Sequence, residues 1–344
     1  MSIMFSEIKE TPAALRALAK DICLMKEVAK KVKEQKINFV ITVARGTSGH
    51  STVYGANVFS VVNGILSGSA PMSFVTCYES NINFNNALVI GVSQSGEGPD
   101  VCQFLEHAKS KGATTVAFVN EIDSRLAKIV DFPICLSAGK EIAVAATKSY
   151  VASLACFYLL SMCIEDKSAE AVADLEECAN LIEKVFTMEE EIKLIAERYR
   201  YMSSGVVLGR GYQFCNAYEA ALKLAETCGI KMRGFSSAEF LHGPIASVHK
   251  DDPVFILAPT GKTFSQVTET VDRLCGRQAE LIILSDDDEL LKKATIPVKM
   301  PACKEILTPM VYICVMQIFA NFLSLTIGND PDSPEGLKKV TKTV

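Results

Sequence analysis

The sequence predicts an α/β protein with two tandem domains, each a mostly parallel sheet flanked by helices. Two observations predict it. Nearly continuous apolar runs of strand length alternate with longer segments of helical periodicity. The whole pattern then recurs about halfway along the chain. At 344 residues, the chain has the length of two ordinary domains.

Three strands are predicted in the first half, at residues 37–43, 87–92 and 115–119. Each is rich in β-branched and other apolar residues and ends in small or polar ones, as parallel strands buried on both faces do. Residues 99–111 carry apolar side chains at helical spacing and predict a helix between two of the strands.

The second half repeats the first, with strands predicted at 205–208, 254–258 and 281–284. Matching positions lie 165 residues apart: Gly46 and Gly211, Ser95 and Thr260, Val119 and Leu284. Lys-Glu-Ile at 140–142 recurs 164 residues later at 304–306, and both copies lead into a long apolar segment. Four matches in step indicate two copies of one domain.

The predicted limits are 1–166 for the first domain and 202–330 for the second. The charged stretch 167–201 has apolar residues at helical spacing and predicts a helical connector. Residues 331–344 form a C-terminal tail that we expect to cover the active site.

Composition excludes several classes of protein. With 49% hydrophobic and 22% charged residues, the chain is neither disordered nor collagen-like. A net charge of −5 argues against nucleic-acid and anionic-membrane partners. The four histidines match no metal-ligand spacing, so we expect no metal.

Location follows from the cysteines and the apolar segments. None of the 12 cysteines forms a C-x-x-C pair and most lie in apolar runs, which favours reduced core thiols in a cytoplasmic protein. The first ten residues lack the apolar core of a signal peptide. The apolar run 151–163 is shorter than the ~20 residues that span a bilayer, so we expect a soluble protein without a membrane segment.

Two loops at predicted strand ends offer hydroxyls, an amide and glycine-exposed backbone: Thr47-Ser48 and Ser93-Gln94-Ser95. Ligands of open α/β sheets bind at such ends, and these groups suit a phosphate held without a metal. Either loop alone is ordinary turn chemistry; the pair predicts a phosphate site. The second copy has Ala258-Pro259 and Thr260-Gly261-Lys262 instead, so we expect it to supply catalytic groups or structure.

Two further features leave alternatives open. Glu219, Lys223 and Glu226 share one face of a predicted helix, either as a solvated ion pair or as a partly buried functional cluster. His242 precedes Gly243-Pro244 at a chain reversal, where it is either structural or an acid–base group.

Taken together, the motifs resemble the sugar isomerase (SIS) family, in particular the isomerase half of glucosamine-6-phosphate synthase and its stand-alone relatives. The matching segments span nearly the whole chain: residues 7–12, 45–48, 93–97, 141–148, 208–211, 219–226, 239–244 and 336–339. The resemblance implies tandem SIS domains of flavodoxin-like, three-layer architecture.

The resemblance also implies roles. The residues that would hold the sugar phosphate are Thr47, Ser48, Ser93, Gln94, Ser95 and Gly98. Glu226 would move the proton between C1 and C2, with Lys223 near the reacting carbons and Glu219 as a further catalytic residue. His242 would open the sugar ring and reach into the neighbouring subunit's site. Lys339 would contact the open-chain sugar and could form a Schiff base, while Val144 and Lys338 would line the sugar site.

Departures from the synthase favour a stand-alone enzyme. The synthase begins with a glutaminase domain and a cysteine after the initiator, whereas Ser2 follows Met1 here, so we expect no ammonia from glutamine by that route. The synthase has threonine where Gly98 stands. Four segments look like SIS-type glucosamine-6-phosphate deaminases: 95–100, 145–149, 235–242 and 337–341.

The expected reaction is deamination of glucosamine-6-phosphate to fructose-6-phosphate and ammonia, with no cofactor. The alternatives are a deglycase of phosphorylated fructosamines, a plain aldose–ketose phosphosugar isomerase, and a sugar-phosphate sensor without catalysis. The resemblance also implies a homodimer. The apolar helices predicted at 144–164 and 305–327 would offer it surface, unless both belong to their own domain cores.

Overall fold

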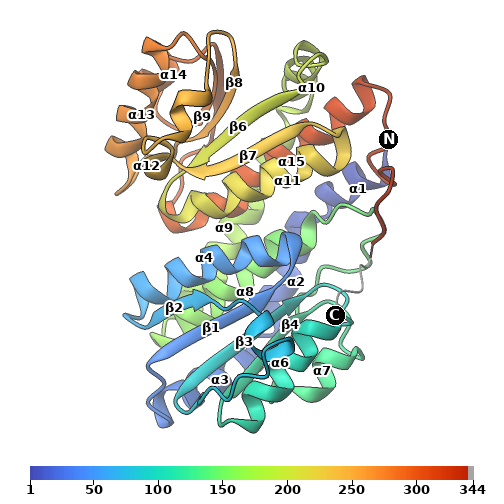
Figure 1. Cartoon of the computed structure of the whole chain (residues 1–344), viewed down its shortest axis with the longest axis vertical. Helices are drawn as coiled ribbons and strands as arrows, with labels where there is room; N and C mark the ends of the chain where they lie inside the picture. Colours follow the sequence, from blue (N-terminus) through green and yellow to red (C-terminus); the bar gives the residue numbers. More distant parts are fainter. Residues whose placement is uncertain (340–344) are drawn as a thin grey trace. The chain divides into compact units, whose positions relative to one another are not determined.

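The computed structural model describes residues 1–339 and contains two five-stranded parallel sheets (Figure 1). The chain divides into two compact units. The first-sheet unit contains Glu10–Glu141, Lys148–Ala179 and, from the described tail, Lys338 and Lys339. The second-sheet unit contains Met1–Lys9, Ile142–Thr147 and Asn180–Leu337.

The first sheet has the strand order β2-β1-β3-β4-β5, and all neighbours are parallel. Its strands are β1 (Phe39–Ala44), β2 (Leu66–Ser69), β3 (Ala87–Ser93), β4 (Thr114–Val119) and β5 (Phe132–Cys135). The register of β1 and β3 pairs Ala44 with Val92, so the loops that follow these two strands start side by side.

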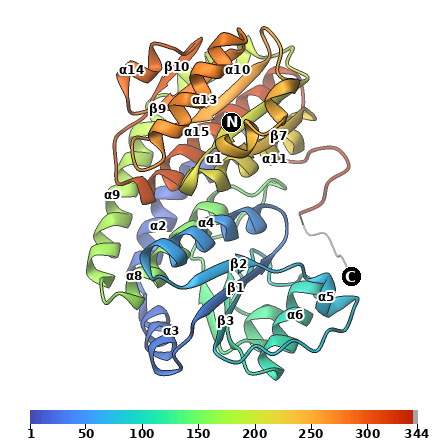
Figure 2. The ribbon, with the colours of Figure 1, turned by 60° about the vertical axis from the view of Figure 1, so that its left-hand side comes forward.

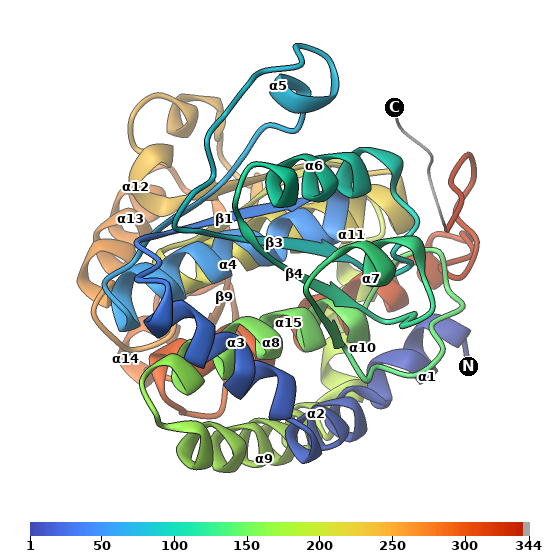
Figure 3. The same ribbon diagram turned by 90° about the horizontal axis from the view of Figure 1, so that it is seen from below.

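Helices cover both faces of the first sheet, and Figure 3 shows α6 and α8 on opposite sides of β3 and β4. Short α5 lies beside α6 (Figure 2). The helices are α2 (Thr11–Lys20), α3 (Cys23–Glu34), α4 (Gly46–Val62), α5 (Ser73–Thr76), α6 (Pro99–Ser110), α7 (Arg125–Ile129), α8 (Lys148–Ile164) and the start of α9 (Ser168–Phe186). On the α6 face, Val101 and Leu105 pack with Val89 of β3. On the α8 face, Phe157 packs edge-on against Phe118 of β4.

The second sheet has the order β10-β9-β8-β6-β7, which repeats the first sheet's topology read from its other edge. Its strands are β6 (Ser204–Gly209), β7 (Lys231–Ser236), β8 (Pro253–Leu257), β9 (Glu280–Ser285) and β10 (Ile296–Lys299). Equal strand order in both halves confirms the predicted α/β architecture and its duplication. Both ends of β1 and β6 differ by the 165 residues of the repeat found in the sequence.

The second sheet is also covered on both faces, with α13 on one side and α11 on the other in Figure 1. Its helices are α1 (Ile3–Lys9), the rest of α9, α10 (Glu189–Arg198), α11 (Phe214–Cys228), α12 (Ser237–Phe240), α13 (Phe264–Gly276), α14 (Asp288–Leu291) and α15 (Thr308–Thr326), with short 3₁₀ turns at Gly211–Gln213, Pro244–Ser247 and Glu305–Leu307. Val267 and Leu274 of α13 pack with Ile256 of β8 in the core of that face.

The inner strands were predictable and the outer ones were not. The predicted runs correspond to β1, β3, β4, β6, β8 and β9. The strands β2, β5, β7 and β10 lie outside them and carry residues that are only half-buried or exposed. Since a parallel strand shows a continuous apolar run only when both faces are covered, these strands lack that signal.

The long apolar helices α8 and α15 differ in part from prediction. Helix α8 begins at Lys148 and not at 144, and all its residues are buried. In α15, all but a few residues are buried as well. Their apolar surface is therefore covered within the chain, and it offers no argument for a dimer.

One described helix, Glu305–Thr326, has the length and composition of a membrane span. Within the structure, 89% of its most apolar window is buried. Core helices of this kind meet the same criteria, so the observation is weak evidence for a membrane segment.

The predicted domain limits at 166, 202 and 330 remain a prediction. The stretch between the sheets is helical, as α9 and α10. Of the tail, residues 331–339 are described, and Val340 and Thr341 of its matching motif lie outside the described residues. All 12 cysteines are free, and seven are buried. Residues 1–339 contain no cluster of His, Cys, Asp or Glu able to hold a metal ion.

Candidate active site

The first predicted phosphate loop forms the start of α4. Gly46 has φ of +51°, a left-handed backbone that glycine adopts without strain, and it turns the chain from β1 into the helix. Thr47 and Ser48 follow in the first turn and are half-buried. The first N–H groups of a helix have no partner within it, and together with the helix dipole they favour an anion.

The second predicted loop follows β3. The Ser93 hydroxyl accepts a bond from the Gly96 N–H at 3.1 Å, and the Ser95 hydroxyl accepts one from Glu97 N–H at 3.4 Å. Ser93, Gln94 and Ser95 are all half-buried. Gly96 has φ of +65°, and a Cβ built on it lies only 2.0 Å from Ser124 Oγ. The turn therefore requires glycine.

The structure brings these two loops together. β1 and β3 are neighbours in the sheet, and Arg45 Nε donates to Asp100 Oδ2 at 2.7 Å. Asp100 lies in the first turn of α6, which Gly98 caps. Since the Asp100 side chain is 2% exposed and that of Arg45 is 60% exposed, the ion pair anchors an exposed cation beside both loops.

Asn120, the residue after β4, connects the loop after β5 to the second phosphate loop. Its N–H donates to Gln94 O at 3.1 Å. Its side chain donates to Gly139 O at 2.7 Å and accepts from Ala138 N–H at 3.1 Å. Asn120 was not predicted as a site residue, because its only signal in the sequence is its position after a predicted strand.

The Glu219–Lys223–Glu226 cluster lies on α11 of the second-sheet unit, and its inner part is buried. The side chains of Glu219 and Lys223 are 0% and 1% exposed, and that of Glu226 is 24% exposed. Lys223 Nζ lies 2.5 Å from Glu226 Oε2 and 3.4 Å from Glu219 Oε1. The structure thus excludes the solvated ion pair that spacing alone left open.

The charge state of Lys223 follows from these neighbours. Burial acts to lower the pKa of the Lys223 ammonium, because desolvation disfavours a charge. The negative charges of Glu219 and Glu226 act in the opposite direction and raise that pKa above its ordinary value. Lys223 therefore stays a cation, and the carboxylate of Glu226 has a fixed positive partner.

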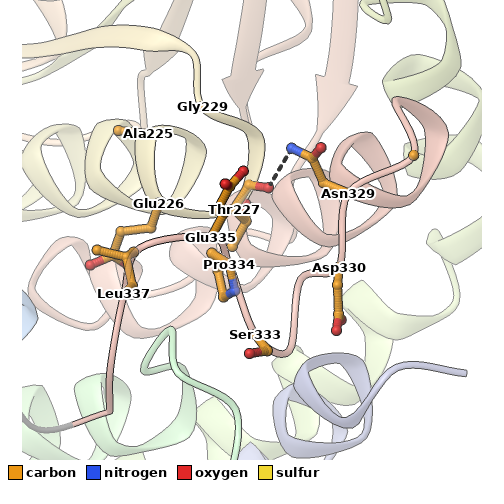
Figure 4. A pocket seen from close by; sticks show the side chains of 11 residues that line it. Ala225, Glu226, Thr227, Gly229, Asn329, Asp330, Ser333, Pro334, Glu335 and Leu337 are labelled. Carbon is orange, nitrogen blue, oxygen red and sulfur yellow. Dashed lines mark hydrogen bonds between the residues drawn. The ribbon is translucent and has the colours of Figure 1, made fainter.

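Glu226 lines a cavity of about 860 Å³ between the end of α11 and the tail. Its walls are Ala225, Glu226, Thr227, Gly229, Gly328, Asn329, Asp330, Ser333, Pro334, Glu335 and Leu337. Asn329 Nδ2 donates to Thr227 O at 3.2 Å, which holds the segment just before the tail to the helix (Figure 4). In Figure 4 the Glu226 side chain leaves α11 next to Leu337. The tail thus forms one wall of the space that Glu226 faces.

His242 and Val144 are placed differently. His242 is exposed in a turn before Gly243, whose φ is +131°. It lines a separate cavity of about 450 Å³ with residues of α12 and α13, and it does not line the Glu226 cavity. Val144 N–H donates to Asp332 O of the tail at 3.0 Å.

The two tail lysines belong to the first-sheet unit. Lys338 is exposed. Lys339 Nζ donates to Glu141 Oε2 at 2.9 Å, and the Glu141 side chain is fully buried. Glu141 is the first residue of the motif at 141–148, and its partner 198 residues away could not be predicted from the sequence.

Comparison with known proteins identifies the fold family. The family model described as "SIS domain" matches residues 34–162 and 203–327, one match on each sheet. The chain belongs to the SIS domain family. Both SIS regions contain the central strands of one sheet, which confirms the predicted tandem arrangement.

Among curated SIS relatives, a glutamine–fructose-6-phosphate aminotransferase [isomerizing] of Thermococcus kodakarensis is 33% identical over 347 residues. The match covers 98% of this chain and 57% of the relative. The chain therefore spans little more than half the length of that protein.

Solved SIS structures share the fold. The C-terminal domain of glucosamine-fructose-6-phosphate aminotransferase from Francisella tularensis superposes with a TM-score of 0.87 at 22% identity, covering 97% of this chain and 98% of that one. Glucosamine-6-phosphate deaminase from Thermotoga maritima gives 0.77 at 22% identity, covering 99% and 100%. At these identities the likeness concerns the fold.

Proposed function

We propose that this SIS protein is an amino-sugar-phosphate isomerase that deaminates glucosamine-6-phosphate. The ring opens, the C2 proton moves to C1, a proton passes from the nitrogen to O1, and the C2–N bond becomes an imine. Water then adds to the imine carbon and ammonia leaves, giving fructose-6-phosphate. One water is consumed, and no oxidant or cofactor enters the balance.

The observation that carries the proposal is the Glu226 carboxylate, which faces a cavity and is bonded at 2.5 Å to a buried lysine. A 1,2 proton shift needs one base that takes a proton and returns it to the adjacent carbon. A carboxylate paired with the buried Lys223 ammonium and only partly exposed to water suits that task. Glu219 keeps the lysine charged from the other side.

The phosphate loops support a phosphorylated substrate. The predicted phosphate residues follow two adjacent strands, as binding loops of open α/β sheets do. They are Thr47, Ser48, Ser93, Gln94, Ser95 and Gly98. A phosphate anchored there supplies binding energy remote from the reacting carbons. The names of the relative from Thermococcus kodakarensis and of the protein from Thermotoga maritima are consistent with a sugar phosphate.

A fructosamine-6-phosphate deglycase is the second candidate. Small-molecule sites measure ~300–1,000 Å³, and the Glu226 cavity of about 860 Å³ lies in the upper part of that range. That volume leaves room for a substituent on the substrate nitrogen. Asp330 and Glu335 in its wall would favour a cationic one.

The test is ammonia release from glucosamine-6-phosphate by purified protein, beside release of an amino acid from a fructose-amino-acid 6-phosphate. We expect ammonia from the wild type and none from Glu226→Gln. Glu335→Gln is the matched control, since it removes a carboxylate from the same cavity without touching Lys223. Equal thermal unfolding temperatures would show that both variants fold.

Three outcomes separate the candidates. Ammonia release that Glu226→Gln abolishes and Glu335→Gln preserves supports the deaminase. Release of an amino acid only, with the same dependence on Glu226, moves the function to the deglycase. If the wild type turns over neither substrate but fructose-6-phosphate raises its unfolding temperature, both candidate reactions are contradicted, and a plain isomerase or a sensor is favoured.

We also propose a cytoplasmic homodimer in which His242 completes the partner's site. Its exposure, and its absence from the lining of the Glu226 cavity, support a role outside its own subunit. Co-refolding the inactive variants His242→Ala and Glu226→Gln should restore activity up to a quarter of wild type, because half of the dimers are mixed and each mixed dimer has one intact site. No recovery in a mixture that light scattering shows to be dimeric contradicts the shared site.

A further inference from the structure

Glu141 is a buried carboxylate whose bonds join a core helix to the tail. Its oxygens accept from Ser149 N–H at 3.2 Å and from the Ser149 hydroxyl at 2.8 Å, at the start of α8. One of them also accepts from Lys339 Nζ at 2.9 Å. The Glu141 side chain is 0% exposed and that of Lys339 is 24% exposed, so the amine of the tail lysine contacts a carboxylate that is shielded from water.

The backbone next to Glu141 is held firmly. Lys148, which is fully buried, donates to Lys140 O at 2.6 Å and pairs with Glu10 at 2.5 Å. This gives a role to Glu10 and Lys148, two motif residues of the sequence that the proposed reaction does not use. A carboxylate on such a support can hold a flexible lysine in one place.

Glu141 also lies at the ligand-binding edge of the first sheet. It follows β5, and the loop between them is bonded to Asn120 through Ala138 and Gly139. Asn120 in turn donates to Gln94 of the second phosphate loop. Hydrogen bonds therefore connect the anchor of the tail lysine to the predicted phosphate site.

The duplicated domain shows that the fold does not require this contact. Glu305 is the repeat equivalent of Glu141 in the second sheet's domain. Its carboxylate turns instead to the loop after β8, accepting from Lys262 N–H at 2.8 Å and from the Thr263 hydroxyl at 3.4 Å. The lysine contact is thus a feature of the first copy.

We propose that Glu141 is the positioning residue for Lys339: its buried carboxylate holds the tail amine at the edge of the sheet where the sugar binds. This inference rests on the proposed function for the role of Lys339. The position of the tail itself can be measured without any substrate.

The experiment compares Glu141→Ala with Ser149→Ala in the full chain. Ser149→Ala is the matched control, since it removes one bond from the same carboxylate and leaves the lysine contact intact. Hydrogen–deuterium exchange of residues 333–339 should rise in Glu141→Ala and stay at the wild-type level in Ser149→Ala. In the ammonia assay, Glu141→Ala should lose about 100-fold in kcat with little change in KM, as expected for misplacing a reacting group. Glu141→Gln keeps an acceptor and should lose less.

The proposal would be overturned if residues 333–339 of Glu141→Ala exchanged hydrogen at the wild-type rate, or if both variants lost kcat equally. If Glu141→Ala does not fold, Lys339→Met gives the same readout, because it removes the contact and leaves the Glu141–Ser149 bonds; unchanged tail exchange there also refutes the anchor. If the wild type turns over no tested substrate, the proposed function fails, while the exchange measurement still decides whether Glu141 holds the tail.

Discussion

Lys223 donates to Glu226 at 2.5 Å, one turn along α11, and its side chain is 1% exposed. The buried ammonium has Glu219 on the other side, at 3.4 Å. A charged group in this environment must be compensated, so each member of the cluster depends on the others.

Replacing Lys223 by methionine should therefore destabilise the protein strongly. The substitution removes the ammonium that lies 3.4 Å from the fully buried Glu219 carboxylate, and breaking a buried pair costs about 3–5 kcal/mol. Urea denaturation would measure the change in the free energy of unfolding. Lys292→Met is the matched control, because Lys292 pairs with Glu289 three residues away, as Lys223 does with Glu226, but on the surface, and its loss should change little. Equal effects of both substitutions would contradict the burial argument.

Gly96→Ala should damage the second phosphate loop. The residue has φ of +65°, and its Cβ would clash with the Ser124 side chain, so we expect a loss of about 1–3 kcal/mol in the free energy of unfolding. Calorimetric titration with inorganic phosphate should show weaker binding as well. Gly276→Ala, in α13 with no atom within 4 Å of the new Cβ, should be neutral or slightly stabilising. Tight phosphate binding by Gly96→Ala would remove this loop from the site.

Asp131 should make stability depend on acid pH. Burial acts to raise the pKa of this carboxyl, but bonds from Lys109 and Thr115 outweigh it and lower the pKa below its ordinary value. A lowered pKa contributes stability above the unfolded value of about 3.9, and that contribution is lost as pH falls through the folded value. The stability difference between wild type and Asp131→Asn should thus be present at pH 7 and shrink below about pH 4.

Urea denaturation of both proteins between pH 7 and the acid limit of folding gives this difference. Asp123→Asn, at an exposed aspartate, serves as the control for an Asp-to-Asn substitution as such. A difference that grows towards acid pH would reverse the sign and contradict the account.

The buried thiols should resist alkylation. Burial raises the pKa of Cys102 and Cys228 to about 11 and that of Cys314 to about 12. At pH 8 a thiol with a pKa of 11 is a thiolate in about one molecule in a thousand, and the thiolate is the nucleophile. Iodoacetamide followed by peptide mass spectrometry should label the exposed Cys23 and Cys77 first. Labelling in guanidinium, where all 12 react, is the control; native modification of Cys314 as fast as Cys77 would be inconsistent with this picture.

Much of the fold could be predicted because its signals are local. The central strands are continuous apolar runs, and duplication brings them back at a constant offset, so the two-sheet α/β architecture followed. The edge strands β2, β5, β7 and β10 escaped because one side of each lacks a neighbour and their residues are not uniformly apolar. The start of α8 was also misplaced, since residues 144–147 are as apolar as the helix but are not helical.

The candidate site divides in the same way. The phosphate loops were predictable because a glycine- and hydroxyl-rich turn directly after a buried strand has a known place in a parallel sheet. Whether Lys223 is buried was not predictable from spacing, which places residues on one helix face without saying what covers that face. Asn120 was missed because its partners, Gln94 and Gly139, lie in two other loops.

The sequence by itself determined the alternation of strand and helix, the duplication, and the residue types at the strand ends, because these depend on neighbours in the chain. Only the tertiary structure decided that Lys223 is enclosed between two carboxylates and that Glu141 holds Lys339 across 198 residues. Both are consequences of packing. A side chain's exposure, and so the strength of its charge interactions, depends on which distant segments close over it.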